Sequence, residues 1–340
     1  MKTIILLDAV HDASTPPEQQ LAEHVELLQV AAQLGIDGVV CGQHFLGTEM
    51  RYYQPVPYLA HLAPHAPAMR IVLGIVLVPL LNPVQIAEDV ATLDVVTSGR
   101  VTLGAGMGYS DRELRAFGID RSERAARFEE SLTLIPKLWS GQPVDHPGHF
   151  FRVDPGTRPS VLPVQRPRPP IWVGGQSRPA VRRAARLADA WYAPPFTTDA
   201  ALRALAAVFA EEREQHGLPP AVEFPVRREL LVAGSKESAR REMADRSAAR
   251  HEVYARWGLA EHGNLRDAGY SFAAASAEEE DGRFLLGTAE DCAEGLARLR
   301  DEVGMTHFVY KPQWLGLPHV DALQQLEAFG TSVLPLLRSG

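Results

Sequence analysis

Short apolar runs alternate with helix-like stretches along most of the chain. Runs of Val, Ile and Leu without polar alternation are typical of strands buried on both faces of a parallel sheet. Such runs occur at residues 3–7, 38–41, 71–78, 101–105, 171–173, 190–193, 226–232 and 307–310. The stretches between them are amphipathic, for example at residues 18–34, 84–96, 124–138, 179–187, 199–216 and 321–337. Because each strand-like run is followed by a helix-like stretch, we predict an α/β fold, a (β/α)8 TIM barrel in a single domain over residues 1–340.

Two segments interrupt this alternation and are interpreted as insertions. Residues 141–169, beyond the fourth strand, are rich in Pro and predict a hairpin followed by a proline-stiffened connection. Residues 258–286, near the seventh and eighth strands, are rich in Gly, Ala and Glu, a composition that indicates a lid or a disordered segment. We expect a lid, because loops that follow barrel strands surround the catalytic mouth.

The composition is that of an ordinary globular protein, and the charge narrows the classes of partner. Of 340 residues, 46% are hydrophobic and 22% are charged, and 34 Lys and Arg against 42 Asp and Glu give a net charge of -8. This balance disfavours nucleic acid and anionic membranes as partners. The two cysteines, Cys41 and Cys292, indicate a reducing, cytoplasmic location rather than a disulfide-stabilised secreted protein. The apolar run at the start is broken by Asp8 and is too short for a signal-peptide core or a membrane span.

The first candidate for chemistry is His44, which follows directly after the second predicted strand. An imidazole at the mouth of a barrel, titrating near neutrality, can move protons or hydrogen-bond a reactive ring. The alternative is a structural or surface histidine. No metal site is predicted, because His61 and His65 have Pro64 between them and no carboxylate nearby completes a site.

Glycines at the ends of two predicted strands indicate close approach of a ligand to the backbone. Gly104, Gly106 and Gly108 do not fit the G-x-G-x-x-G fingerprint, because a frame begun at Gly104 ends on Tyr109. What remains is either a strand end that admits a flat ligand or a tight turn into the next helix. Gly74 lies inside the third strand, where a glycine indicates a bulge, contact with a ligand, or simply a weakened strand.

A third glycine-containing strand end predicts an anion site. The fifth strand ends in Gly174 and Gly175, and Ser177 can cap a helix with Pro179 in its first turn. The N–H groups and dipole at such a helix start attract an anion, although an ordinary capped turn is the alternative. Arg178, Arg182 and Arg183 add positive charge near this turn. Arg124 and Arg127 share one face of the preceding helix, from which either could reach a phosphate.

Read together and in this order, these segments resemble the bacterial luciferase-like family of flavin-dependent oxidoreductases. The similarity runs over nearly the whole chain, in GIDGVVCGQHF (35–45), NPVQIAEDVATLDVVTSGRVTLGAGMGYSDRELRAFG (82–118), RAARFEESLTLIPKLWSGQPV (124–144), PPIWVGGQS and RAARLADAW (169–191), and GTAEDCAEGL and GMTHFVY (287–310). The resemblance implies a (β/α)8 barrel that holds a reduced flavin or deazaflavin at its C-terminal mouth.

The resemblance also implies roles for individual residues. His44 matches the histidine beside the flavin ring, a proposed general acid/base. Gly74 and Ile75 match a strand-three bulge that often holds a non-prolyl cis peptide behind the ring. The remaining matches are the cofactor wall at Gly106, Met107, Gly108 and Tyr109, and the phosphate end at Gly174, Gly175, Gln176 and Ser177.

The chain also departs from luciferase proper, which has a reactive Cys and a phosphate-pairing Arg where this chain has Gly106 and Met107, and a second His at Phe45. Light emission is therefore not expected. The phosphate is expected to rely on Ser177, backbone amides, and Arg124, Arg127 or Arg178 instead. Phe45, Trp191 and Trp314, near strand ends, are candidates for an apolar substrate pocket, with packing as the alternative.

The resulting hypothesis is a monooxygenase that uses reduced FMN and dioxygen to oxygenate a small organic substrate. The absence of an NAD(P)H fingerprint fits a separate NAD(P)H:flavin reductase as the source of reduced flavin, and the resemblance favours a homodimer. One alternative is a deazaflavin-dependent dehydrogenase or reductase of the same fold. A second is a non-catalytic flavin-binding subunit, against which the retention of His44 argues.

Overall fold

Eight parallel strands form the central sheet of the protein, as seen in a computed structural model that describes residues 1–7, 15–47, 50–244 and 282–338. The strands are β1 (Lys2–Leu6), β2 (Gly38–Cys41), β3 (Arg70–Leu77), β4 (Val101–Gly106), β7 (Ile171–Gly174), β8 (Ala190–Tyr192), β9 (Pro225–Arg227) and β12 (His307–Tyr310). They pair in the order β8-β7-β4-β3-β2-β1-β12-β9. A parallel bridge between Ala193 and Val226 joins the end of β8 to β9 and nearly closes the sheet. The predicted (β/α)8 barrel is therefore confirmed.

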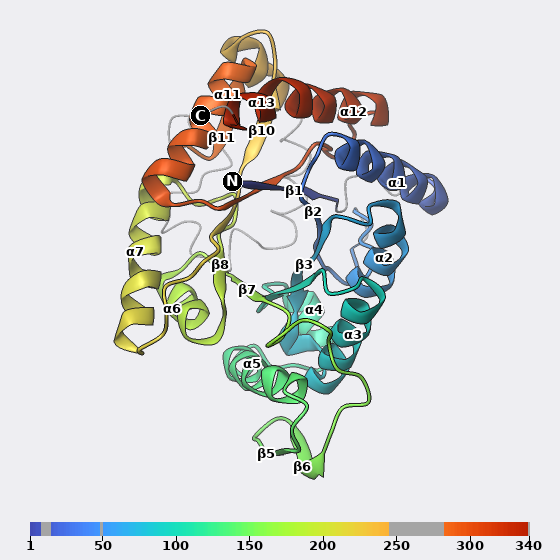
Figure 1. Cartoon of the computed structure of the whole chain (residues 1–340), viewed down its shortest axis with the longest axis vertical. Helices are drawn as coiled ribbons and strands as arrows, with labels where there is room; N and C mark the ends of the chain where they lie inside the picture. The colour runs from blue at the N-terminus through green and yellow to red at the C-terminus, as the bar shows by residue number, and fades with distance from the viewer. Residues whose placement is uncertain (8–14, 48–49, 245–281, 339–340) are drawn as a thin grey trace.

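Helices form a ring around the strands, with α1, α2 and α3 on one side and α6 and α7 on the opposite side (Figure 1). They are α1 (Pro17–Gln33), α2 (Pro55–Leu62), α3 (Pro83–Val96), α4 (Asp111–Ala116), α5 (Arg124–Trp139), α6 (Arg178–Leu187), α7 (Asp199–Gln215), α11 (Ala289–Arg298), α12 (His319–Ala328) and α13 (Leu334–Arg338). Side chains that accept a backbone N–H of the first turn cap several helices: Asn82, Ser110, Ser177, Thr198 and Thr288. Within the described ranges, no helix combines the length and the apolar character needed to cross a lipid bilayer.

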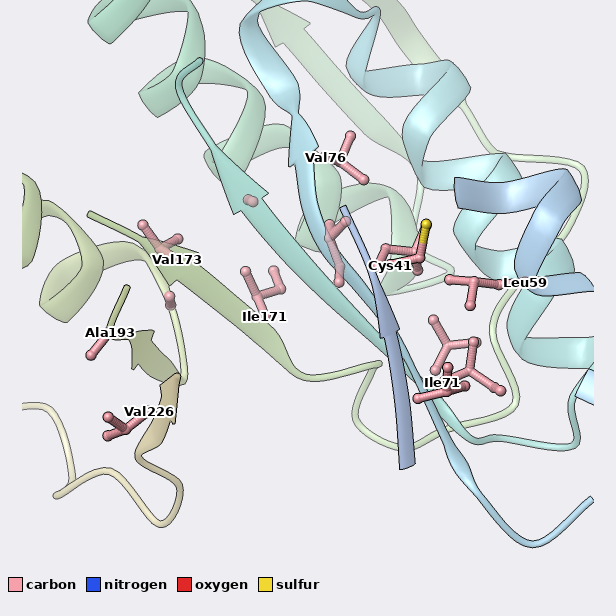
Figure 2. Packing of buried hydrophobic residues seen from close by; sticks show 14 of the residues in the cluster. Cys41, Leu59, Ile71, Val76, Ile171, Val173, Ala193 and Val226 are labelled. Atoms are coloured by element: carbon pink, nitrogen blue, oxygen red, sulfur yellow. The ribbon is translucent and has the colours of Figure 1, made fainter. Parts of the chain in front are cut away.

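Both faces of the barrel strands are buried, and this explains the continuous apolar runs in the sequence. On β1, Ile4 and Leu6 belong to the cluster that fills the barrel interior, whereas Ile5 packs in the larger cluster beneath the helices. Figure 2 shows part of that larger cluster, in which Cys41 and Ile71 of the barrel strands lie beside Leu59 of α2. Helices are thus fixed to the outer face of the sheet by the same strands whose inner side chains fill the barrel.

The predicted hairpin in the first insertion is confirmed. Strands β5 (Val144–Pro147) and β6 (Arg152–Thr157) pair antiparallel and lie beyond α5 at one end of the molecule (Figure 1). The carboxylate of Glu130 on α5 accepts the backbone N–H groups of Phe150 and Phe151 at 3.0 and 2.8 Å, and His146 Nε2 lies 3.2 Å from it. The hairpin is therefore fastened to the helix that precedes it.

The predicted lid lies largely outside the described residues, which resume at Gly282. The end of that segment is not a loop, because β11 (Phe284–Gly287) pairs in parallel with β10 (Glu229–Val232). The expectation of a loop through residue 286 was wrong at this point. The apolar run of β11 is only a few residues long and follows a stretch rich in Ala and Glu, so the local pattern did not separate it from its surroundings.

The seventh predicted strand, at residues 226–232, is divided in two. Its first part, β9, pairs with β12 in the barrel, whereas β10 leaves the barrel to pair with β11. Arg228 stands at the division with a fully buried side chain, and its Nη2 donates to Asp199 Oδ1 at 3.3 Å. The change of direction is therefore associated with a buried ion pair rather than with a glycine or proline.

Charged side chains meet at the N-terminal end of the barrel, opposite the mouth. Arg70 donates to both carboxylate oxygens of Glu223, at 2.6 and 3.1 Å, and its guanidinium lies 4.9 Å from the ring centroid of Trp172. The Trp172 indole donates to Glu223 at 2.7 Å, and His307 Nε2 lies 3.3 Å from Arg70 Nη1. Burial and then Arg70 lower the pKa of His307 to about 4, outweighing the opposite effect of Glu223. His307 is therefore neutral in the folded protein near pH 7.

We expect the free energy of unfolding to fall as the pH is lowered from about 6.5 to 4. In that window the unfolded chain protonates His307 and the folded chain does not, at about 1.4 kcal/mol per pKa unit, or up to about 3 kcal/mol. The pKa of Glu223 is also lowered, through its bonds with Arg70, so its contribution is lost below about pH 4.5. Urea unfolding of His307→Gln should show a flatter pH dependence between pH 6.5 and 4. The exposed His61→Gln serves as the control, and an equal slope in the wild type and His307→Gln would contradict the assignment.

Candidate active site

His44 is held at the C-terminal end of β2 by a buried carboxylate. Its Nδ1 lies 3.1 Å from Glu113 Oε1, and the rings of Tyr52 and Tyr109 lie edge-on to the imidazole at 4.8 and 5.5 Å. A Glu113 carboxylate accepts the Nδ1 proton, which fixes the tautomer in which Nε2 carries the lone pair. This arrangement suits a group that accepts and returns a proton at Nε2.

Glu113, the partner of His44, is a candidate site residue that the sequence did not predict. It lies on the short helix α4 with 2% of its surface exposed, and Oε1 also accepts the backbone N–H of Phe45 at 2.7 Å. Oε2 is buried and has no hydrogen-bond partner within the described part of the chain. The sequence signal was the S-x-x-E spacing of Ser110 and Glu113, which is typical of a capping box. Here the serine caps the helix, but the glutamate reaches across to the loop of His44 instead of back to the cap.

Two glutamines hold the loop that carries His44. Gln43 Oε1 accepts the backbone N–H of Leu77 at the end of β3, and Gln43 Nε2 donates to Gln54 Oε1, both at 2.8 Å. Gln54 in turn donates to the His44 carbonyl at 3.2 Å. The position of His44 is therefore fixed through its backbone as well as through its ring.

Glycines of two neighbouring strands, β4 and β7, lie against the side chain of Ile75. The Gly74–Ile75 peptide is cis, as the resemblance implies, and the pairing of β3 with β4 shifts register between Leu73 and Val76. A Cβ at Gly106 on β4 would collide with Ile75 Cδ1, and one at Gly174 on β7 would lie 3.3 Å from the same atom. Gly106 and Gly174 therefore form a cradle that accommodates the Ile75 side chain.

The predicted anion turn has the expected local structure. The Ser177 hydroxyl accepts the N–H of Ala180 at 3.3 Å and caps α6, which has a proline in its first turn. A Cβ at Gly175 would lie 2.7 Å from Ala180 Cβ, so only glycine lets the turn pack against the start of the helix. The turn therefore presents the positive end of the α6 dipole beside β7.

The arginines named from the sequence are distributed over different contacts. Arg124 donates to the Gly108 carbonyl at 2.8 Å, and burial, together with neighbouring Arg121 and Arg183, lowers its pKa. Arg127 instead donates to the Pro79 carbonyl at 3.2 Å and lies over the rings of Phe150 and Phe151 in the hairpin.

On α6, Arg183 pairs with Glu129 at 2.7 Å and Arg182 with Glu212 at 3.4 Å, whereas Arg178 is exposed. The structure therefore brings Arg124 to the predicted cofactor wall and directs Arg127 to the insertion. Arg121, which the sequence reasoning did not single out, donates to the Tyr109 carbonyl at 2.7 Å.

The structure corrects the placement of two predicted pocket residues. Trp191 is 1% exposed and stacks on Phe224 at 5.3 Å on the helix side of β8, while Tyr192 belongs to the barrel interior. Successive residues of a strand point to opposite faces, and the strand end alone did not reveal which one faced inward. Trp314, also 1% exposed, packs with Phe284 and other buried residues against β10 and β11.

Phe45 remains close to the site, next to His44, and its ring contacts Phe117 at 4.6 Å between centroids. Its role in substrate binding stays a prediction. Among the residues that the structure describes, no group of three or more His, Cys, Asp or Glu side chains could hold a metal ion.

Comparisons with known proteins show the family and the fold of the chain. The sequence model of the family described as luciferase-like monooxygenase matches residues 1–307. The oxygenase component of the flavin-dependent trigonelline monooxygenase of Acinetobacter baylyi is 30% identical over 172 residues, which cover 50% of this chain and 47% of that protein. The F420-dependent glucose-6-phosphate dehydrogenase of Beutenbergia cavernae is 30% identical over 339 residues and 91% of each protein.

Among solved structures, the oxygenating constituent of 3,6-diketocamphane monooxygenase of Pseudomonas putida, in complex with FMN, has a TM-score of 0.81. It is 20% identical, with 99% of this chain and 98% of that chain covered, and shows the same fold. The chain spans about half the length of the first curated relatives that it matches. The family match covers far more than half of this chain, and the protein therefore belongs to the luciferase-like monooxygenase family.

Proposed function

We propose that this protein is a flavin-dependent monooxygenase that uses reduced FMN and dioxygen to oxygenate a small organic molecule. The observation that carries the proposal is the His44–Glu113 pair beside the glycine cradle around Ile75. A proton-transfer group and a surface that admits a flat ring stand together at the mouth of a barrel, where enzymes of this fold bind their substrates. The flavin-dependent oxygenase relative supports the same chemistry.

The residues present fit reduced FMN. Gly74 and Ile75 would lie behind the ring, with the Ile75 side chain seated against Gly106 and Gly174. The wall at Gly106, Met107, Gly108 and Tyr109 would flank it. The phosphate would meet Gly175, Gln176 and Ser177 at the start of α6, with Arg124 as the nearby cation. Bound reduced FMN supplies the electrons that activate dioxygen.

The contribution of the protein is proton transfer and exclusion of water. His44 accepts or returns a proton at Nε2, and the Glu113 carboxylate on Nδ1 stabilises the imidazolium and keeps the ring oriented. The rings of Tyr52 and Tyr109 shield the imidazole from solvent, since the His44 side chain is only 15% exposed. A separate NAD(P)H:flavin reductase would supply reduced FMN, in line with a relative that is named as an oxygenase component.

A deazaflavin-dependent dehydrogenase is the second candidate, favoured by the F420-dependent relative that aligns over 91% of this chain. In that case His44 would accept the hydroxyl proton of an alcohol, and a bound deazaflavin would supply the hydride acceptor. The ring cradle and the proton-transfer pair serve both reactions. A non-catalytic role agrees less well with the complete His44–Glu113 pair.

Anaerobic binding followed by exposure to air separates the two candidates. The monooxygenase is expected to bind reduced FMN more tightly than oxidised FMN or reduced F420. When air is admitted, it should consume oxygen and oxygenate small organic compounds offered as a panel. Bovine serum albumin at equal concentration controls for free flavin chemistry. Tight binding of F420 without binding of reduced FMN would reject the monooxygenase in favour of the dehydrogenase.

A further inference from the structure

Trp191 connects the helix layer to the turn at the end of β7. Its indole Nε1 donates to the Gly175 carbonyl at 2.7 Å, and its ring stacks on Phe224 with centroids 5.3 Å apart and planes inclined by 27°. Phe224 is itself fixed, because its backbone N–H donates to Thr306 Oγ1 at 2.6 Å and its carbonyl accepts the Thr306 N–H at 3.1 Å. The indole is thus held in one orientation against the turn.

The hydrogen bond to Gly175 sets the plane of the next peptide. In a trans peptide the carbonyl of one residue and the N–H of the following residue point in opposite directions. Holding the Gly175 carbonyl toward Trp191 therefore directs the Gln176 N–H away from Trp191. Gly175 itself has no side chain that restricts its backbone, and the Trp191 indole is a side-chain contact that favours this orientation.

We propose that Trp191 is a positioning residue for the phosphate of the cofactor. Its indole N–H fixes the turn so that the Gln176 N–H and the Ser177 cap face the ligand together. The inference rests on the proposed function, because it takes the phosphate of reduced FMN as the group that this turn binds. Trp191 does not touch the ligand and acts only through Gly175.

The test compares reduced FMN with reduced riboflavin, which has the same ring and no phosphate. Dissociation constants of both are measured anaerobically for the wild type and for Trp191→Phe, which keeps an aromatic ring but lacks the indole N–H. We expect the wild type to prefer reduced FMN, and Trp191→Phe to lower that preference about tenfold. The change should come from weaker FMN binding, with the riboflavin constant altered less than about twofold.

Trp139→Phe is the matched control, because Trp139 is also buried and its indole donates to a backbone carbonyl, that of Ala87 at 2.9 Å. It should leave the FMN preference unchanged. Should Trp191→Phe not fold, Phe224→Leu removes the stacking ring but keeps the indole, and we expect it to lower the preference about threefold.

Three kinds of result would contradict the role of Trp191 or the proposed function. An unchanged preference in Trp191→Phe, or in Phe224→Leu where that variant replaces it, overturns the positioning role. An equal loss of affinity for both flavins also overturns it, because that is the behaviour of a merely structural residue. A wild type that binds both reduced flavins equally contradicts the inference but leaves flavin use intact, whereas a wild type that binds neither contradicts the proposed function itself.

Discussion

Replacing His44 by alanine is expected to lower the turnover number for oxygenation by about 100- to 1,000-fold. General acid–base groups contribute rate enhancements of this size, and Glu113 holds His44 in the orientation that such a role needs. Affinity for reduced FMN should change less than about fivefold, since the ring and phosphate are assigned to Ile75 and to the turn at Gly175. Rapid-mixing measurements of product formation with saturating reduced FMN would show the loss in turnover.

The exposed His61→Ala is the control for this substitution. It removes an imidazole from α2 and should leave both turnover and binding as in the wild type. Turnover by His44→Ala within threefold of the wild type would remove His44 from the mechanism, while leaving the flavin site untested by that result alone. A loss of flavin binding in His44→Ala, equal to the loss of turnover, would assign it to binding instead.

Gly106→Ala is expected to weaken binding of reduced FMN by about 30-fold or more. The new methyl group would collide with Ile75 Cδ1 and lie 3.0 Å from Cγ1, so the isoleucine must rotate into the space assigned to the ring. Because the colliding atom is the end of a side chain, the protein should still fold, with a loss of about 1–3 kcal/mol in unfolding free energy. Anaerobic equilibrium dialysis measures the first effect and urea unfolding the second.

Gly234→Ala provides the matched substitution, since a Cβ there meets no atom within 4 Å. Its flavin affinity and stability should be close to those of the wild type. If Gly106→Ala bound reduced FMN as tightly as Gly234→Ala, the cradle around Ile75 could not be the ring site.

Most of the barrel strands could be predicted from the sequence because each is buried on both faces. Residues such as Ile4 and Ile5 face different clusters, yet both must be apolar, so the strands stood out as uninterrupted runs. β11 did not stand out, because its partner β10 is distant in sequence and its own run is short. The division of the seventh strand at Arg228 depends on a partner on another element, Asp199, which local periodicity cannot reveal.

The glycines of the candidate site could be predicted from the sequence, because close backbone packing requires them. Residues whose contribution depends on the direction of a side chain could not be predicted. Gly74, Gly106 and Gly175 stand where a Cβ would collide or crowd, and their positions after apolar runs indicated close packing. Glu113 was not predicted because its partner His44 is 69 residues away in the sequence. Its spacing from Ser110 also matches that of a capping box at the start of a helix. Trp191 was named as a candidate for the substrate pocket because a strand of only three residues offers no alternation that shows which side chain faces inward.

The closure of the barrel at Ala193 gives the mouth a seam. Among the described residues, two backbone hydrogen bonds cross it, from Ala193 to Pro225 and from Arg227 to Ala193, both at 3.0 Å. Local opening costs least where the fewest backbone bonds must break together, so this joint is a favoured place for the sheet to open. The turn at Gly175 lies on one side of this seam and the β10–β11 pair on the other. Because the Trp191 ring of β8 stacks on Phe224 just before β9, any widening of this joint would also move the indole that holds the turn at Gly175.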